Sequence, residues 1–174
     1  MPAALEVRAT EPTDHVALSA LYAEAFPEED LRPLVQALLA ELTGVVSLAA
    51  AADGALVGHL AVTLCGIGGA ENAAALLGPL AVHPSHQRQG VGRALIEAGV
   101  AHMHDTSARL ILVLGDPAYY GRFGFETGHG VAAPYALPKE WEDAWRALPL
   151  KPGPAPAGSL NPPAPWRRPE LWAP

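Results

Sequence analysis

The most informative part of the sequence begins with Leu77-Gly78-Pro79-Leu80-Ala81-Val82 and continues, after four further residues, with Gln87-Arg88-Gln89-Gly90-Val91-Gly92. Residues 73–82 are apolar at every position except Gly78, which is typical of a central strand with both faces covered. Proline cannot donate a hydrogen bond to a neighbouring strand. We therefore expect a bulge near Gly78-Pro79 that splays this strand away from one neighbour.

The second half of the stretch predicts a loop that enters a helix over 91–104. Gly90 and Gly92 let successive backbone N–H groups converge on one point, and the helix dipole adds positive potential there. This arrangement predicts an anion site, typically for phosphate, to which Arg88 and Arg93 add charge. A P-loop would need a Lys-Ser/Thr pair, and a dinucleotide-binding loop would need glycine in place of Leu95. Two glycines alone are equally compatible with a tight turn that binds nothing.

The chain before this stretch alternates between recognisable strand and helix patterns. The expected elements are a strand over 5–10, a helix from Thr13 or Asp14 to Pro27, a helix over 31–42, and strands over 45–52, 56–67 and 73–82. Asp53-Gly54 predicts a hairpin turn, and 68–72 predicts a second turn. Two helices followed by a strand meander indicate an α+β layered domain.

Beyond residue 104 the patterns are shorter. They predict a strand over 110–114 that runs parallel to 73–82 after a helical crossover, a short helix over 118–123, and a weak strand over 143–150. Nine of the 18 prolines lie in 149–174, so we expect an extended tail, packed on the domain through Trp166 and Trp172. The predicted organisation is one domain over 3–150 and a Pro-rich extension over 151–174.

Composition narrows the classes of partner. The 174 residues carry a net charge of −7, and residues 1–30 hold seven acids against one base, whereas the chain has only two lysines. Such a balance argues against nucleic acid and against an anionic membrane surface. The single cysteine, Cys65, lies in an apolar strand and is expected to be a buried small hydrophobe. The sequence has one cysteine, no signal-peptide pattern and no apolar run long enough to span a membrane. These features favour a cytoplasmic protein. We expect a monomer or a homodimer.

Two motifs together resemble those of the GNAT superfamily of N-acetyltransferases. Gln87, Gly90 and Gly92 match the family pattern Arg/Gln-x-x-Gly-x-Gly/Ala, and the segment from Tyr120 to Phe125 matches Tyr-x-x-x-Gly-Phe. The residues of both motifs are most similar to those of the YhbS-like predicted acetyltransferases. The resemblance covers most of the chain. It implies a GNAT-like fold, with a mixed central sheet, a splayed parallel strand pair and flanking helices.

The resemblance also implies acetyl-CoA as co-substrate. The pantetheine arm would pair with the backbone of Leu80, Ala81 and Val82. The pyrophosphate would lie on the loop and first helical turn, formed by Gln87, Arg88, Gln89, Gly90, Val91, Gly92 and Arg93.

The implied activity is direct transfer of the acetyl group to a primary amine, with no covalent enzyme intermediate. Tyr120 stands where the family pattern places the general acid, and a phenol with pKa near 10 is protonated when a thiolate leaves. The alternatives are that Tyr120 only packs and Tyr119 faces the site, or that neither residue does. A backbone N–H near Ala81 or Val82 would stabilise the oxyanion. The rival function is a non-catalytic acyl-CoA-binding sensor or regulatory module of the same fold.

The general base and the acceptor are less well specified. Many family members carry a Glu on the central strand or its neighbour, but residues 73–82 hold no carboxylate, which leaves Glu71, Asp116 or a water chain. Asp116 is equally a candidate helix cap. The acceptor is set by the two N-terminal helices and their link in this architecture. The acids in that link, Glu28, Glu29 and Asp30, either attract a cationic amine or simply complement the following helix dipole.

Histidines are the remaining candidates for chemistry. Seven are present, and the closest pairs are His83 with His86 and His102 with His104. Neither pair brings a cysteine or a second acid at ligand spacing, so we expect surface or loop histidines and no metal site.

Overall fold

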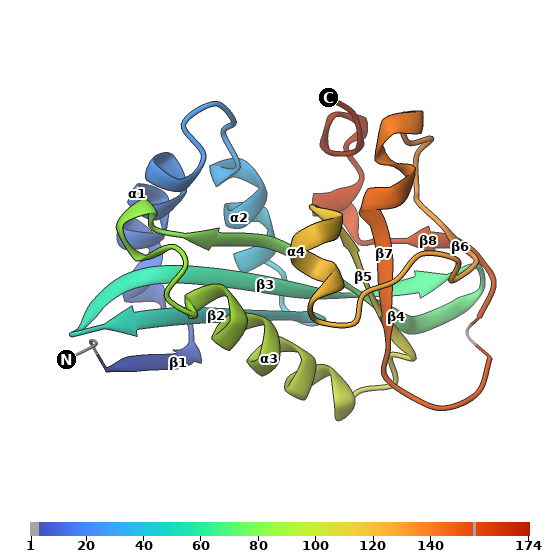
Figure 1. Cartoon of the computed structure of the whole chain (residues 1–174), viewed down its shortest axis with the longest axis horizontal. Coiled ribbons are helices and arrows are strands. Elements are labelled where there is room, and N and C mark those ends of the chain that lie inside the picture. The colour runs from blue at the N-terminus through green and yellow to red at the C-terminus, as the bar shows by residue number, and fades with distance from the viewer. Residues whose placement is uncertain (1–3, 155) are drawn as a thin grey trace. The chain divides into compact units, whose positions relative to one another are not determined.

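The computed structural model describes residues 4–154 and 156–174, and its elements follow the expected order (Figure 1). The α-helices are α1 (His15–Ala25), α2 (Arg32–Leu39), α3 (Val91–His104) and α4 (Pro117–Gly121). The strands are β1 (Leu5–Ala9), β2 (Val45–Ala52), β3 (Ala55–Ile67), β4 (Ala70–Val82), β5 (Leu110–Leu114), β6 (Val131–Ala132), β7 (Trp145–Pro149) and β8 (Gly158–Asn161). Short 3₁₀ turns cover Pro12–Asp14, Pro84–His86, Lys139–Ala144, Ala164–Trp166 and Pro169–Trp172.

The strands form a mixed sheet in the order β1-β2-β3-β4-β5-β7, and β8 pairs with both β3 and β6. β1 and β2 are antiparallel, whereas β4 and β5 are parallel, as the helical crossover predicted. The parallel ladder covers Ala74–Leu76 against Leu110–Leu112. β5 still pairs with β7 as far as Leu114, so the β4–β5 ladder ends first. The predicted splaying of the parallel pair is thus confirmed, and Gly78 at φ 143° marks the irregular backbone at this point.

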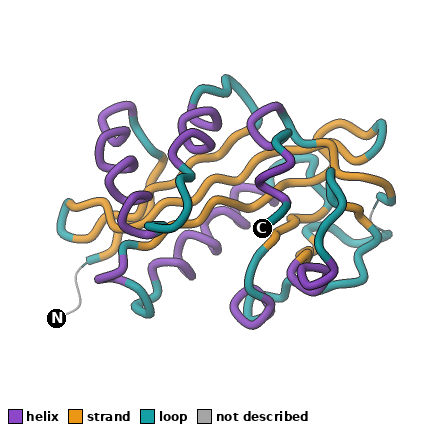
Figure 2. The backbone as a smooth tube through the Cα atoms, turned by 90° about the horizontal axis from the view of Figure 1, so that it is seen from above, coloured by secondary structure: helices purple, strands orange, loops and turns teal. Residues whose placement is uncertain are grey.

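The chain divides into two compact units, Met1–Val62 with Pro79–His102 and Thr63–Gly78 with Met103–Pro174. In the first unit, helices cover both faces of β3, because alternate residues of a strand point to opposite faces. Gly58 lies close to Val91 and Leu95 of α3, whereas His59 contacts Tyr22 of α1. The tube in Figure 2 follows these elements, with helices (purple) on both sides of the strands (orange).

Several boundaries differ from the expected ones. The second helix ends at Leu39 rather than 42, and Leu42 is 97% exposed, because the chain must leave the helix to reach β2 at Val45. The turn between β3 and β4 is shorter than predicted, since β4 already begins at Ala70. The short helix of 118–123 begins at Pro117 and ends at Gly121, and the weak strand of 143–150 shortens to β7.

In the second unit, three tryptophans form a buried aromatic cluster. The indole N–H groups of Trp145, Trp166 and Trp172 donate to the carbonyl of Val131 (2.8 Å), the Thr63 hydroxyl (3.3 Å) and the carbonyl of Trp166 (3.0 Å), respectively. The Pro-rich segment is therefore more than an extended tail, because it also contributes β8 and two 3₁₀ turns.

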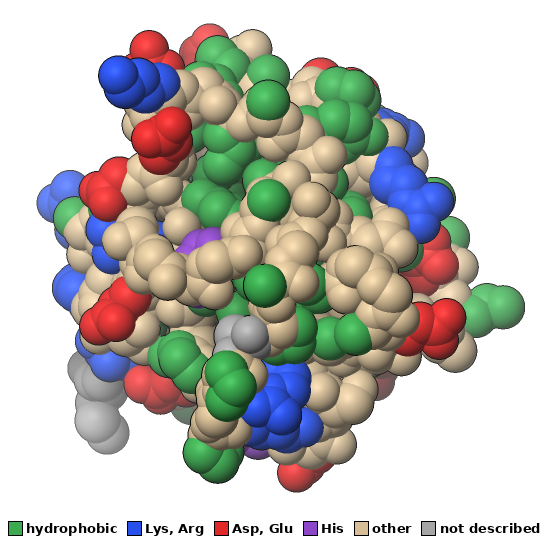
Figure 3. All heavy atoms as spheres, turned by 90° about the vertical axis from the view of Figure 1, so that its right-hand side faces the viewer, with side chains coloured by type: hydrophobic (Ala, Val, Ile, Leu, Met, Phe, Trp, Pro, Cys, Tyr) green, Lys and Arg blue, Asp and Glu red, His purple; other side chains and the backbone are tan. Residues whose placement is uncertain are grey.

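Burial of Cys65 bears on the reactivity of its thiol. Cys65 is buried, as expected, and burial raises the pKa of its thiol to about 12, so it is no nucleophile at neutral pH. No described helix is both long enough and apolar enough to cross a membrane. On the face drawn in Figure 3, Lys and Arg side chains (blue) lie in separate groups among acidic (red) and hydrophobic (green) ones.

Candidate functional site

The loop between β4 and α3 has the backbone shape that its glycines predicted. Gly90 adopts φ +86°, and Arg88 adopts φ +61° although it carries a side chain. The first backbone hydrogen bond of α3 runs from the Ala94 N–H to the Gly90 carbonyl at 3.0 Å. The amides of Val91, Gly92 and Arg93 therefore precede the helical ladder, where a helix has donors to offer an anion. The first turn of α3 contains no acidic residue.

Side chains of this loop hold its own backbone. Gln87 Nε2 donates to the Val82 carbonyl at 3.3 Å, and Gln89 Nε2 donates to the Ser85 carbonyl at 3.2 Å. Arg93 Nη1 lies 3.5 Å from Glu97 Oε1, one turn further along α3. The Gln87 side chain thus ties the loop to the end of β4, and the Gln89 side chain ties the loop to its own 3₁₀ turn.

The strand segment Leu80, Ala81 and Val82 lies at the end of β4, beyond the ladder with β5. Leu80 and Val82 are half-buried, and Ala81 is buried. Ala81 packs in one apolar cluster with Leu18 and Tyr22 of α1 and Val35 of α2. The segment and the following loop belong to the same unit, so the strand and the first turn of α3 are parts of one local structure.

Tyr120 lies in the second unit, on α4, and its ring is held on two sides. A Cβ at Gly115 would come within 2.3 Å of the Tyr120 ring, so only glycine fits there, and the Phe125 ring meets it edge-on at 5.8 Å. Burial raises the pKa of Tyr120, which keeps the phenol protonated. Among the described residues its hydroxyl has no hydrogen-bond partner, yet no side-chain polar atom is both buried and unpaired. The hydroxyl therefore reaches the surface, where it can donate a proton.

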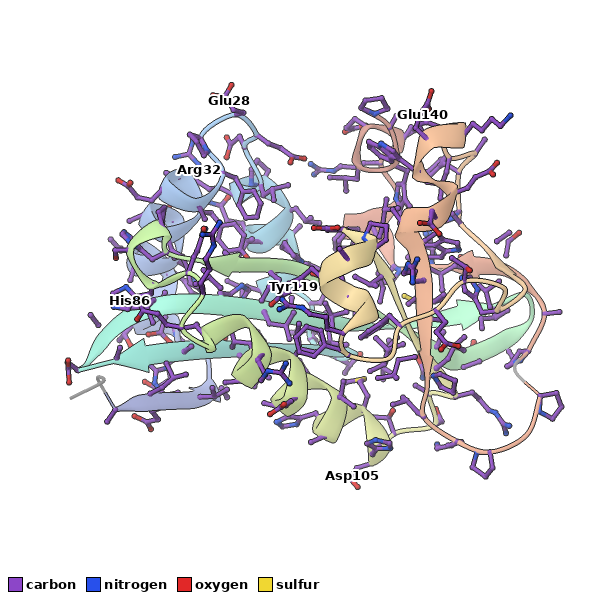
Figure 4. All side chains as sticks on the ribbon, viewed as in Figure 1. Glu28, Arg32, His86, Asp105, Tyr119 and Glu140 are labelled. Carbon is purple, nitrogen blue, oxygen red and sulfur yellow. The ribbon has the colours of Figure 1, made fainter. Side chains whose placement is uncertain are left out.

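The other tyrosine of α4 has different neighbours. The ring of Tyr119, labelled in Figure 4, meets Phe123 edge-on at 5.3 Å, and the Arg122 guanidinium lies 5.0 Å from its centre. The two tyrosine rings themselves meet edge-on at 5.0 Å. Because their environments differ, Tyr119 is a suitable control for Tyr120.

The two candidate carboxylates for the general base lie in unremarkable positions. Asp116 Oδ1 accepts a hydrogen bond from the Ala118 N–H at 3.0 Å, so its predicted alternative role as a helix cap is confirmed. Glu71 is exposed near the start of β4. Neither position gives a carboxylate whose burial or partner would tune it for proton abstraction.

The helices α1 and α2 enclose a cavity of about 300 Å³ in the first unit. Its buried wall includes Leu18, Tyr22 and Val35, and its exposed rim includes His15, Arg32 and Gln36. Asp30 in the link is bound to Arg32, with Oδ1 accepting from the backbone N–H at 3.1 Å and from Nε at 2.7 Å.

The other two acids of the link behave differently from Asp30. Glu28 and Glu29 are exposed, and the side chain of Glu28 points outward from the link (Figure 4). Asp30 thus serves the start of α2, whereas Glu28 and Glu29 remain candidates for attracting a cation.

The expectation about histidines is wrong for His59, which is 1% exposed on β3. Its Nδ1 lies 2.7 Å from the Tyr22 hydroxyl, and its Nε2 lies 2.8 Å from Ser47 Oγ. The available signal was its position inside 56–67, a strand that is apolar on both faces. No group of three or more potential metal-ligating side chains occurs in the described part of the chain.

Comparison with known proteins connects this geometry to a family. The family model described as "Acetyltransferase (GNAT) family" matches residues 15–125. The uncharacterized N-acetyltransferase YjhQ of Escherichia coli K12 is 33% identical over 143 residues, which cover 78% of this chain and 79% of YjhQ.

Solved structures are similar over nearly the whole chain. The E. coli GNAT family N-acetyltransferase YhbS, solved in complex with CoA, has a TM-score of 0.84 at 24% identity and covers 97% of this chain and 94% of its own. A GNAT family acetyltransferase from Brucella melitensis, solved with acetyl-CoA, has a TM-score of 0.77 at 30% identity and covers 94% and 99%. With both motifs, the mixed sheet and the acid-free start of α3 in place, this chain belongs to the acetyltransferase (GNAT) family.

Proposed function

We propose that the protein transfers the acetyl group of acetyl-CoA directly to a primary amine, with Tyr120 as general acid. The amine nitrogen attacks the thioester carbonyl, the C–S bond breaks, and the Tyr120 hydroxyl gives its proton to the leaving thiolate. The amine loses one proton to solvent or to a base, and Tyr120 regains one from solvent, so charge and atoms balance.

The observation that carries the proposal is the start of α3. The left-handed backbone at Arg88 and Gly90 leads into a first turn without acids, at the motif that matches the family pattern. We assign the pyrophosphate of acetyl-CoA to the main chain from Gln87 to Arg93. The pantetheine arm is assigned to the backbone of Leu80, Ala81 and Val82.

The chemistry of Tyr120 supports the second half of the proposal. A phenol with a raised pKa stays protonated, so it can hydrogen-bond to the sulfur as negative charge develops there. Full transfer of its proton is uphill, because a thiol is a stronger acid than this phenol, and replacement of the proton from solvent completes the step. The hydroxyl reaches the surface, and Gly115 and Phe125 fix the ring that carries it.

A thiol-release assay with acetyl-CoA and a panel of amines tests the proposal. The panel includes a polyamine, a lysine-containing peptide, a peptide with a free N-terminus and small apolar amines. Amine-dependent release of CoA is the expected result. If acetyl-CoA raised the melting temperature but no amine in the panel caused release of CoA, the result would instead favour the acyl-CoA-binding sensor.

A further inference from the structure

A chain of hydrogen bonds runs through the first unit and ends on the main chain of β4. It begins at Thr10 Oγ1, which donates to Ser47 Oγ at 2.8 Å. Ser47 Oγ lies 2.8 Å from His59 Nε2, and His59 Nδ1 lies 2.7 Å from the Tyr22 hydroxyl. The Tyr22 hydroxyl donates in turn to the Pro79 carbonyl at 3.4 Å. The side chains come from the end of β1, from β2, from β3 and from α1.

One assignment of protons satisfies every link of this chain. If Ser47 donates to Nε2, the ring proton of His59 is on Nδ1 and donates to Tyr22, which leaves the Tyr22 proton for the Pro79 carbonyl. With the ring proton on Nε2 instead, His59 Nδ1 would accept the Tyr22 proton, and the Pro79 carbonyl would receive none. The satisfied assignment directs all four hydrogen bonds toward Pro79.

The chain is uncharged at neutral pH. Burial lowers the pKa of His59 to about 4 and raises the pKa of Tyr22. A neutral imidazole between two hydroxyl groups is a poor store for a proton, so the chain fixes geometry rather than carrying charge.

The Pro79 carbonyl is the last main-chain acceptor before the segment Leu80, Ala81 and Val82. The Tyr22 ring also packs in the apolar cluster that contains Ala81. Tyr22 therefore bonds the residue directly before this segment through its hydroxyl, and its ring belongs to the same apolar cluster as Ala81. We propose that Tyr22, oriented by His59, Ser47 and Thr10, is a positioning residue that sets the backbone of this segment for the pantetheine arm. This inference rests on the proposed function, because that function assigns the arm to these residues.

The substitution Tyr22→Phe tests the inference because it removes one hydroxyl and keeps the ring. The fold should survive, because the ring keeps its packing in the apolar cluster, although one buried nitrogen of His59 loses its partner. Two probes are titrated by calorimetry: acetyl-CoA, and 3′-phosphoadenosine 5′-diphosphate, which is the nucleotide half without the pantetheine arm. Acetyl-CoA affinity should fall roughly three- to tenfold, the worth of one neutral hydrogen bond. Affinity for the nucleotide half should stay within about twofold, because the α3 turn is untouched.

Two further variants make the result specific. Tyr135→Phe makes the same chemical change at a half-buried position of the second unit and should alter neither affinity. Ser47→Ala breaks the chain between Thr10 and His59, and it should weaken acetyl-CoA binding selectively, by less than Tyr22→Phe does.

Three outcomes overturn the inference. The first is that Tyr22→Phe weakens binding of both probes equally, which would indicate general loosening of the unit. The second is that Tyr22→Phe weakens binding of neither probe. The third applies if Tyr22→Phe fails to fold, and it is that Ser47→Ala shows no selective loss of acetyl-CoA binding. Failure of the proposed function is seen separately, as wild-type protein that does not bind acetyl-CoA.

Discussion

The described α-helices differ in whether an acid stands just before the first helical residue. Asp116 accepts from the Ala118 N–H at the start of α4, and Asp30 accepts from the Arg32 N–H at the start of α2. Asp14, before α1, accepts from the Glu11 N–H and binds Arg8. The start of α3 differs from all three, because Gly90 stands directly before it and residues 83–90 contain no acid.

We interpret this difference as one between structural helix starts and a start proposed to bind a ligand. A carboxylate of the chain satisfies local amides and neutralises the positive end of the helix dipole, so it removes the potential that would attract an external anion. At α3 that potential is retained beside the main chain of Gly90 and Gly92. This contrast supports the proposal that acetyl-CoA binds at the start of α3, and that α4, whose start is capped, carries the proposed general acid Tyr120.

Tyr120→Phe is expected to have the largest effect. If α4 serves chemistry alone, kcat should fall by roughly 10²–10⁴, the usual worth of a positioned acid. The acetyl-CoA affinity should stay within a few-fold, because the lost proton transfer matters mainly in the transition state. Steady-state kinetics and calorimetry measure both quantities. Tyr119→Phe is the control and should lower kcat much less. If Tyr119→Phe lowered kcat strongly and Tyr120→Phe did not, Tyr119 rather than Tyr120 would be the general acid.

Gly92→Asp puts an acid at the start of α3, where residues 83–93 otherwise have none. The carboxylate would lie against the pyrophosphate, and such a like-charge contact costs several kcal/mol, so binding should weaken by roughly 10²-fold or more. The rise in melting temperature with acetyl-CoA should disappear, while the fold persists because an acid in the first turn favours the helix. Gly92→Ala is the uncharged control. A folded Gly92→Asp protein with a normal thermal shift would place the pyrophosphate elsewhere.

How far the sequence predicts this contrast depends on how local each feature is. The Gly-rich start of α3, the Asp116 cap and the hairpin at Asp53-Gly54 were predictable, because each depends on residues adjacent in the chain. The His59 chain was missed because its partners Tyr22 and Ser47 are 37 and 12 residues away in the sequence, and only packing brings them together. Leu42 was misassigned for a related reason. Leu42 has the spacing of the helical apolar residues, but α2 ends at Leu39 because the chain must leave the helix to reach β2 at Val45.

Asp14 provides a pH test of a helix-start acid that is paired with a cation. Its bidentate contact with Arg8, at 2.8 and 3.0 Å, lowers the pKa of Asp14 to about 2 from 3.8. A lowered folded-state pKa stabilises the protein above the unfolded pKa, and this stability is lost as the pH falls through about 2. Because Arg8 is partly exposed, we expect roughly 1–2 kcal/mol. Urea unfolding of wild type and Asp14→Asn should differ by this amount at pH 6 and converge toward pH 2; a constant difference would exclude the ion pair as its source.

Asp116→Ala removes the cap of α4 and should lower the free energy of unfolding by about 1 kcal/mol, whereas Asp116→Asn should retain most of it. The thermal shift with acetyl-CoA should be the same in both variants, because this helix start binds no cofactor. Chemical denaturation measures the first quantity, and a melting series with acetyl-CoA measures the second. A diminished shift in Asp116→Ala alone would mean that α4 contributes to binding.

The acids of the α1–α2 link are expected to have the smallest effect, a change in the KM for a cationic amine. Asp30 is bound to the start of α2, whereas Glu28 and Glu29 are exposed and are free to act at a distance on a cationic amine. The double substitution Glu28→Gln with Glu29→Gln should raise the KM for a cationic amine a few-fold at low salt, and it should leave the KM for acetyl-CoA unchanged. The effect should shrink in high salt, because a Debye length of about 10 Å at 0.1 M screens exposed charges. Asp30→Asn serves as the matched control: it should lower stability slightly through the start of α2 and leave the amine KM nearly unchanged. If Asp30→Asn raised the amine KM as much as the double variant does, net charge alone would account for the effect, and the division between structural and steering acids in this link would be wrong.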